Sequence, residues 1–313
     1  MQFLNDKTNI NFLKFGRIAV VFSAILVLIS IVELGFFGLN FGLDFTGGTR
    51  VEVHYPQTAD LKEVRTRLKE AGLDGAIVQY FGTSNDVAIR IPPVEGKKGQ
   101  EVGEIVLKAL REGGQKVEMR QIEFVGPSVG EELTQQGILA MVLALICIMI
   151  YVAARFEWKF SVGAVAALAH DVLITIGIFS LRGLEFDLTV LAAILAVIGY
   201  SLNDTIVVYD RIRENFLKLR KATPEEVVNK SINQTLSRTL ITSGTTIMVL
   251  VALFVWGGAL IHGFATALLI GILIGTYSSI YVASTLALTL GVSKEDLMPP
   301  QVEKEGADQP PLL

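Results

Sequence analysis

Several polar side chains lie inside a long apolar run, where they could bind or carry a proton. The run opens near Leu188 and ends near Asp210, and its inner polar residues are Ser201, Asn203, Asp204 and Thr205. At about 1.5 Å of helical rise per residue, Asp204 lies roughly 9 Å inside the end of this run. An ionised carboxylate at that depth costs about 2.5–3.5 kcal/mol on insertion scales. Asp204 therefore either handles a proton or ion, or shares a hydrated helix end.

Two further groups of polar residues fall within apolar runs. His170 and Asp171 form an adjacent pair, which suits a proton relay and a packed helix interface equally well. Arg238 opens another run, and Thr242 continues a polar stripe inward from it. A proton on Asp204 would weaken its attraction to Arg238, so helix packing could depend on protonation. The alternative for Arg238 is an ordinary anchor at the membrane surface.

The elements that hold these residues are apolar enough to use the membrane as their solvent. Hydrophobic residues make up 51% of the chain, charged residues 19%, and the mean hydropathy is +0.52. This composition excludes an ordinary soluble domain, and we expect no nucleic-acid partner. Because a helical span needs about 20 apolar residues, the pattern predicts six spans. They are expected at about 18–37, 137–154, 160–181, 187–209, 240–258 and 263–288.

The positions of lysine and arginine predict how the chain is oriented. These residues collect before the first span and in alternate connections thereafter, whereas the short loops on the other side carry only Arg182. The positive-inside rule then places both termini in the cytoplasm and the long polar insert outside. We expect a cytoplasmic N-terminus with the first span (1–37), an extracytoplasmic domain (38–135), a five-helix membrane domain (136–290) and a disordered cytoplasmic tail (291–313).

The external insert has a readable order of strands and helices. Alternating and helical periodicities predict strands at 49–55, 76–81, 87–91 and 116–125, and helices at 60–71 and 102–110. The order β-α-β-β-α-β is the split ferredoxin-like pattern. The expected fold class is thus an α-helical polytopic membrane protein with six transmembrane helices and one external ferredoxin-like α+β domain. That fold supports many functions, so it indicates no chemistry by itself.

Glycine-rich stretches join this domain to the membrane. The residues expected to act as hinges are Gly42, Asp44, Gly47, Gly48, Gly126 and Pro127. Glycine tolerates the unusual backbone angles of such a junction. The Gly47-Gly48 pair lacks the Lys-Ser/Thr of a phosphate-binding loop, and one His beside one Asp is too few for a metal site. We therefore expect neither a cofactor nor a metal.

Two surfaces are expected to pack or bind. Small residues recur every fourth position in the last span, at Gly263, Ala267, Gly271, Gly275 and Ser279. Such a stripe lets another helix approach closely; it is either a helix of the same chain or, as we expect, one of a partner subunit. Residues 211–238 alternate charged and apolar residues, which predicts an amphipathic helical hairpin on the cytoplasmic membrane surface.

Four stretches of the chain carry a resemblance to a known family. They are Gly42–Thr49, Val125–Pro127, Ala167–Asp171 and Gly199–Asn215. Together they resemble the SecF family of the bacterial Sec protein-export machinery, in order over nearly the whole chain. The resemblance implies one half of a transporter of the resistance-nodulation-division superfamily, which uses the proton gradient to assist late steps of translocation. It also identifies Asp204 as the family's intramembrane acidic residue and Arg238 as its arginine at the start of the fifth span.

The same resemblance implies partners and a location. SecD would supply the other six-span half as a heterodimer, and the SecYEG channel and the translocating polypeptide would be further partners. SecA, YajC and YidC complete the candidates. The protein would be a multi-pass subunit of the bacterial cytoplasmic (inner) membrane with a periplasmic domain, and an accessory subunit rather than an enzyme.

Three rival functions are open to test. Asp171 and Asp204 could form the carboxylate pair of an intramembrane aspartyl protease, but the Tyr-Asp and Gly-x-Gly-Asp signatures of that class are missing. A passive assembly scaffold would keep its function after Asp204→Asn, whereas a proton-driven subunit would not. A small-molecule exporter of the same superfamily is disfavoured by the single six-span half and the small external domain.

Overall fold

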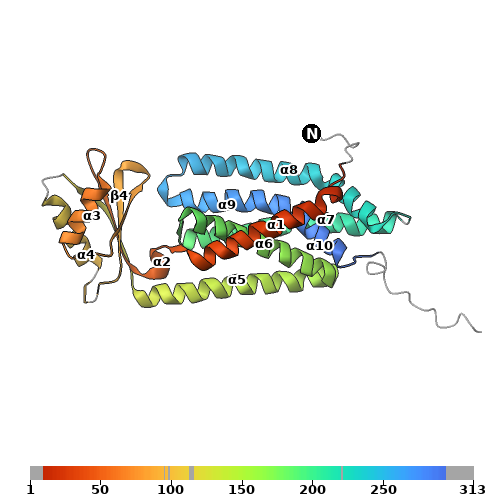
Figure 1. The fold of residues 1–313 in the computed structure, drawn as a ribbon, viewed down its shortest axis with the longest axis horizontal. Coiled ribbons are helices and arrows are strands. Elements are labelled where there is room, and N and C mark those ends of the chain that lie inside the picture. Colours follow the sequence, from red (N-terminus) through yellow and green to blue (C-terminus); the bar gives the residue numbers. More distant parts are fainter. Residues whose placement is uncertain (1–9, 95, 98, 113–115, 220, 294–313) are drawn as a thin grey trace, which may run out of the picture.

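The computed structural model describes residues 10–94, 96–97, 99–112, 116–219 and 221–293. A small α+β domain stands at one end of a long bundle of helices (Figure 1). From position 294 onward, the tail that was expected to be disordered lies outside the described residues. The fold class expected from the sequence, a helical membrane protein with one α+β domain, is confirmed.

Within the described residues, six helical segments are long and apolar enough to cross a membrane, one for each predicted span. They are α1 (Gly16–Phe36), α5 (Pro127–Arg155), α6 (Trp158–Arg182), α7 (Leu188–Lys218), α8 (Pro224–Trp256) and a last segment formed by α9 (Ala259–Ser278), a π-turn (Ser279–Ala283) and α10 (Ser284–Thr289). A short 3-10 turn (Leu13–Phe15) leads into α1. Helix α5 begins ten residues before its predicted start, because Pro127 at the first helical position is preorganised for helix entry.

Helices α7 and α8 run past their predicted ends and form the expected hairpin. Thr223 begins α8 with a capping box, in which its side chain and that of Glu226 each accept a backbone N–H of the other. The apolar residues of the hairpin are buried in the core of the bundle: Ile212, Phe216, Val227, Val228 and Ile232. Because this face is already covered, the hairpin lengthens the bundle, and the expectation that its apolar face lies on the membrane surface is wrong.

The external domain has the predicted ferredoxin-like topology. Its elements are β2 (Gly48–His54), α3 (Leu61–Glu70), β3 (Ile77–Phe81), β4 (Thr83–Ile91), α4 (Gly99–Arg111) and β5 (Glu118–Val125). The strands are antiparallel in the order β3-β4-β2-β5, and α3 and α4 cover one face of the sheet (Figure 1). Val51, Val53 and Ile89 point into the core beneath the helices. Strand β4 begins earlier than predicted because Gly82 alone, at φ 77°, makes the turn.

A compact junction connects the domain to the bundle. Strand β1 (Asn40–Phe41) pairs in parallel with β6 (Glu185–Phe186), and helix α2 (Leu43–Thr46) follows β1 directly. Arg90 of β4 reaches across and donates hydrogen bonds to the Phe41 carbonyl at 2.5 Å and to Asn40 Oδ1 at 3.0 Å. The sheet of this domain is therefore held against the adjacent end of the bundle by polar contacts as well as by the chain itself.

The small-residue stripe of α9 packs against α7 of the same chain. A Cβ built on Gly263 would lie 3.1 Å from Val190 Cγ2, and one on Gly271 would lie 2.2 Å from Val197 Cγ2. Ala267 and Ser279 in the same stripe are fully buried. The expectation that a partner subunit binds this stripe is therefore wrong, because α7 presents its own residues there at matching helical spacing.

Candidate intramembrane polar site

Asp204 is buried in the bundle with little hydrogen bonding. It lies on α7 and is 3% exposed. Among the described residues, Ser243 of α8 is the one side chain that donates a hydrogen bond to this carboxylate, at a long Oγ–Oδ2 distance of 3.4 Å. Ser243 Oγ also lies 2.8 Å from Thr276 Oγ1 of α9. Asp204 therefore stands where α7, α8 and α9 meet, with a weak and shared hydrogen bond.

Asp171 is the second buried carboxylate, and its environment is different. Its Oδ1 lies 2.9 Å from His170 Nδ1, while Oδ2 accepts hydrogen bonds from Ser201 Oγ at 2.6 Å and Ser278 Oγ at 2.8 Å. These partners come from α6, α7 and α9, so the carboxylate ties the three helices together. A Cβ on Gly275 would lie 3.5 Å from Asp171 Oδ2, so that glycine gives the carboxylate room.

The two carboxylates differ in how their charge is compensated. A buried ionised carboxylate is costly unless hydrogen bonds replace its lost hydration. Asp171 has three such partners, which suits a permanent structural charge. Asp204 accepts one long hydrogen bond, so protonation, which removes its charge, would leave few hydrogen-bond donors without an acceptor. Of the two, Asp204 is the carboxylate whose charge is less compensated by hydrogen bonds.

Three other residues expected in the proton pathway form no hydrogen bond or ion pair with Asp204 within the described residues, although the charge of Arg238 acts on its carboxylate. Arg238 is exposed and forms no ion pair with any described residue, and Asn203 is exposed too. Thr242 donates hydrogen bonds to the carbonyls of Arg238 and Thr239, both at 3.0 Å, within its own helix. The structure thus brings Asp204 together with Ser243 and Thr276, and it leaves the three other residues outside this contact.

Ser243 was missed by the sequence reasoning, although a signal for it exists. The buried residues of α8 include Thr239, Ser243 and Leu250, which follow the spacing of one helix face. Thr242, one position earlier, lies on the flank of that face. Ser278 was missed in the same way, because the stripe at Ser279 drew attention to the neighbouring position.

Two buried polar atoms on the membrane helices α6 and α8 have no hydrogen-bond partner among the described residues. They are His170 Nε2 and Thr239 Oγ1. Unpartnered buried polar atoms are uncommon in proteins, and each of these two could still form a hydrogen bond. No group of three or more His, Cys, Asp or Glu residues forms a metal-binding cluster in the described ranges.

The predicted hinge residues form a tightly packed junction. Gly47 at φ 65° and Gly48 at φ 123° adopt backbone angles that favour glycine, and a Cβ on Gly48 would lie 2.3 Å from the Ile91 carbonyl oxygen. Asp44 Oδ2 accepts a hydrogen bond from the backbone N–H of Leu188, the first residue of α7, at 3.0 Å. Gly126 caps α5 and Pro127 opens it.

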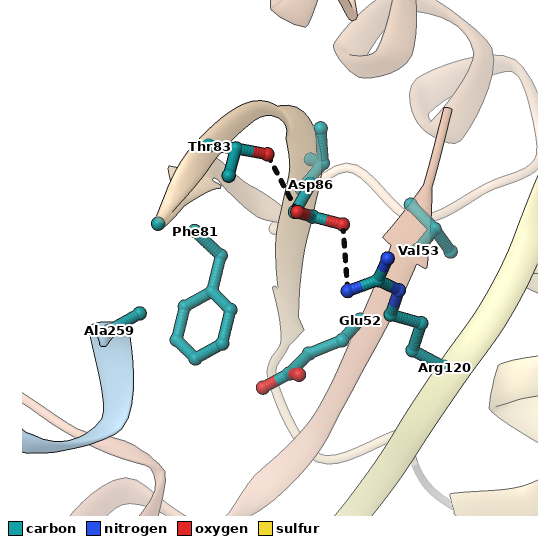
Figure 2. A pocket seen from close by; sticks show the side chains of 9 residues that line it. Glu52, Val53, Phe81, Thr83, Asp86, Arg120 and Ala259 are labelled. Atoms are coloured by element: carbon teal, nitrogen blue, oxygen red, sulfur yellow. Dashed lines mark hydrogen bonds and ion pairs between the residues drawn. The ribbon is translucent and has the colours of Figure 1, made fainter. Parts of the chain in front are cut away.

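Beside this junction, hollows separate part of the external domain from the bundle. Figure 2 shows one of about 200 Å³, in which the Phe81 ring lies between Ala259 at the start of α9 and the Glu52 carboxylate. A larger cavity of about 820 Å³ adjoins it and is lined by residues of both domains, Phe81 and Ala259 included. Burial raises the pKa of the Glu52 carboxyl, with Arg50 opposing the rise. A hydrogen bond from Thr83 lowers the pKa of Asp86.

Comparisons with known proteins decide the family. Residues 105–293 match the SecD/SecF protein export membrane protein C-terminal family, and residues 34–59 match the SecD/SecF GG motif. The protein translocase subunit SecF of Vibrio alginolyticus is 56% identical over 308 residues, covering 98% of both chains. The chain belongs to the SecF family. SecF of Escherichia coli O157:H7 is 51% identical over 305 residues, which cover 97% of this chain and 94% of that protein.

Solved structures agree with this assignment. The SecDF crystal structure from Thermus thermophilus, described as a translocon-associated membrane protein, has a TM-score of 0.83 and 38% identity. The match covers 91% of this chain and 39% of that one, so the chain spans about two fifths of the SecDF chain. A second SecDF structure, in a super-membrane-facing form, has a TM-score of 0.69 at the same identity. The resemblance expected from the sequence is confirmed: this is a SecF subunit of the protein translocase and a multi-pass protein of the bacterial inner membrane.

Proposed function

We propose that this SecF subunit pairs with SecD and uses proton binding at Asp204 to promote polypeptide translocation through SecYEG. The observation that carries the proposal is the poorly compensated carboxylate of Asp204, buried where α7, α8 and α9 meet. Ionisable residues inside membrane helices are costly, and they commonly mark ion pathways. In this account the subunit is an accessory that changes shape, and it catalyses no covalent reaction.

A single proton supplies enough energy for such a change. Moving one charge through about 100 mV is worth about 2.3 kcal/mol. That energy shifts a two-state equilibrium nearly fiftyfold, to about 50:1 from an even starting point. Protonation removes the charge of Asp204, so the packing of α8 and α9 around α7 differs between the two states.

The external domain has room to respond. It contacts the bundle at the junction around Arg90 and Glu185, and the hollows leave open space from Glu185 to Phe81 and Ala259. A body that is tied on one side and free on another can tilt. With both termini cytoplasmic, as the lysine and arginine distribution indicates, this domain would face the emerging polypeptide in the periplasm.

Helix α5 offers a surface for the SecD half. Only 6% of its most apolar window is buried within this chain. Its exposed apolar side chains include Ile138, Val142 and Ile146, which recur at helical spacing. Lipid alone would satisfy this face, but pairing with a second six-span half would also cover it. The proposed contacts with SecYEG, SecA, YajC and YidC follow from membership of the SecF family.

The rival functions fit the geometry less well. An aspartyl protease needs two carboxylates that share one proton. Here Asp171 is bound by His170, Ser201 and Ser278, and within the described chain it shares no hydrogen bond with Asp204. A passive scaffold has no use for a poorly compensated buried carboxylate, and it predicts normal export after Asp204→Asn.

The test is export into sealed vesicles with an imposed proton gradient, using native SecD and variants of this chain at equal expression. Asp204→Asn should abolish the stimulation by the gradient, because an amide does not ionise, and Asp204→Glu should retain part of it. Asp210→Asn is the matched control: Asp210 lies on the same helix but is exposed, with a 3.3 Å ion pair to Arg155. Solvent-exposed ion pairs contribute little to stability. Equal stimulation in Asp204→Asn and Asp210→Asn would refute the proposal.

A further inference from the structure

Asp44 joins two parts of the chain that are far apart in sequence. Its carboxylate accepts the N–H of Leu188, a contact between positions separated by 144 residues. The start of α7 already has its own cap, because Asp187 accepts the N–H of Val190 at 2.9 Å and the Thr189 hydroxyl at 2.7 Å. Asp44 is therefore not needed to begin the helix. What it adds is a link between α7 and the segment around α2.

The helix that Asp44 contacts is the one that carries Asp204. Helix α7 is continuous from Leu188 to Lys218. Asp204 lies about 24 Å from Leu188 along the axis, at about 1.5 Å per residue. A continuous helix moves largely as a rod, so a shift of α7 at Asp204 also displaces its first residue.

At its other end, the link leads from α2 directly into strand β2 of the external sheet. Asp44 lies in the single turn of α2, and β2 begins at Gly48, next to the centre of the sheet. The Gly42 N–H donates to the Phe186 carbonyl at 2.8 Å, which holds the start of this turn on the bundle. The space for a Cβ on Gly48 is taken by the Ile91 carbonyl oxygen, 2.3 Å away. A displacement of α2 therefore passes directly to β2.

We propose that Asp44 is a positioning residue that couples the movement of α7 to the external domain. The inference rests on the proposed function, since Asp204 is taken as the group that moves the helix. The hydrogen bond from Leu188 is the coupling contact, so an oxygen acceptor at position 44 is required and its negative charge is not. Without this contact, the Gly42 and Arg90 hydrogen bonds still hold the external domain on the bundle, but α2 no longer follows the first residue of α7.

A disulfide can report the position of the external domain. A Cβ on Gly82 would lie 3.6 Å from the Ala259 Cβ, which is within the separation that a disulfide requires. The reporter carries Gly82→Cys and Ala259→Cys in a Cys147→Ser background, in vesicles that also contain cysteine-free SecD. Gly82 has φ 77°, so the new cysteine is strained, but the strain is the same in every variant compared.

The measurement is the rate of disulfide formation with and without Asp204→Asn. With Asp44 intact, we expect Asp204→Asn to change this rate by about fivefold or more, the lower end of typical coupling between sites. Asp44→Ala should remove that difference. Asp44→Asn should keep it, because the amide oxygen accepts the same hydrogen bond. Asp187→Ala is the matched control, since it removes a cap from the same helix end and leaves the Asp44 contact in place.

Each other outcome overturns the inference. If the Asp204 effect persists in Asp44→Ala, the link is wrong while the proposed function stands. If Asp44→Asn behaves like Asp44→Ala, or if Asp187→Ala also removes the effect, the Leu188 hydrogen bond is not the coupling contact. If Asp44 affected stability alone, Asp44→Ala would change the rate of disulfide formation by the same factor with and without Asp204→Asn, and the ratio of the two rates would stay the same. If Asp204→Asn has no effect with Asp44 present, the proposed function fails, and this inference fails with it.

Discussion

The packing of α9 on α7 gives a quantitative prediction at Gly271. A Cβ at this position would lie 2.2 Å from Val197 Cγ2 and 2.7 Å from Val197 Cγ1, far inside contact distance. Overpacking of this kind costs about 1–3 kcal/mol. Alanine regains up to about 1 kcal/mol of helix propensity. Gly271→Ala should therefore lower the free energy of unfolding, by about 2 kcal/mol at the upper clash cost and full propensity gain.

Two controls on the same helix pair separate the clash from the general effect of replacing glycine. Gly199 on α7 has nothing within 4 Å of a built Cβ, so Gly199→Ala should be neutral or slightly stabilising. Val197→Ala in the Gly271→Ala background should restore part of the loss. Coupling energies between contacting residues are about 0.5–3 kcal/mol, so the rescue is measurable.

The assay is denaturant unfolding of the purified chain in detergent micelles, followed by helix content, for the single variants and the double variant. Gly271→Leu should destabilise the chain itself and should reduce SecD co-purification only as far as folding is lost. If Gly271→Leu weakens SecD binding while unfolding is unchanged, the stripe faces a partner and the packing described above is wrong. Additive effects of the Gly271 and Val197 changes would also contradict it.

Three further predictions concern other parts of the chain. Asp171→Ala removes the shared acceptor of His170, Ser201 and Ser278 and should cost about 3–5 kcal/mol of stability in the same micelle assay, a loss that Asp171→Asn should reduce. Glu52 has a pKa raised by burial, so its ionisation disfavours the folded domain as pH rises above its ordinary value of 4.5; Glu52→Gln should raise the melting temperature at pH 7 and have no such effect in acid. Gly48→Ala forces a side chain against the Ile91 carbonyl at φ 123° and should destabilise the external domain by about 1–3 kcal/mol, which hydrogen exchange in β2 would detect.

Much of the fold could be predicted because the membrane and the sheet impose strong patterns. Apolar runs of span length gave all six membrane helices, and the strand and helix order gave the ferredoxin-like domain. The ends of α7 and α8 could not be placed in the same way. The apolar spacing of residues such as Ile212 and Val228 predicts a membrane-facing stripe and the core of a hairpin equally well. Only the residues that pack against them distinguish the two interpretations.

The candidate site shows the same limit more sharply. Sequence position gives the depth of Asp204 in the membrane, but the rotation of α8 around its axis decides whether Thr242 or Ser243 faces it. The same applies to Ser278, which binds Asp171, and to its neighbour Ser279. The stripe in α9 predicted a close helix contact but not which helix makes it, because a small-residue face carries no information about its partner.

Proton uptake tests the central claim most directly. Vesicles that contain this chain, SecD and SecYEG, with a pH-sensitive dye in the lumen, would report proton movement while a polypeptide is translocated. The account predicts that translocation-dependent proton movement is lost in Asp204→Asn and retained in Asp210→Asn at equal expression. Equal proton movement in these two variants would show that Asp204 is merely a polar residue of α7, and it would contradict the account.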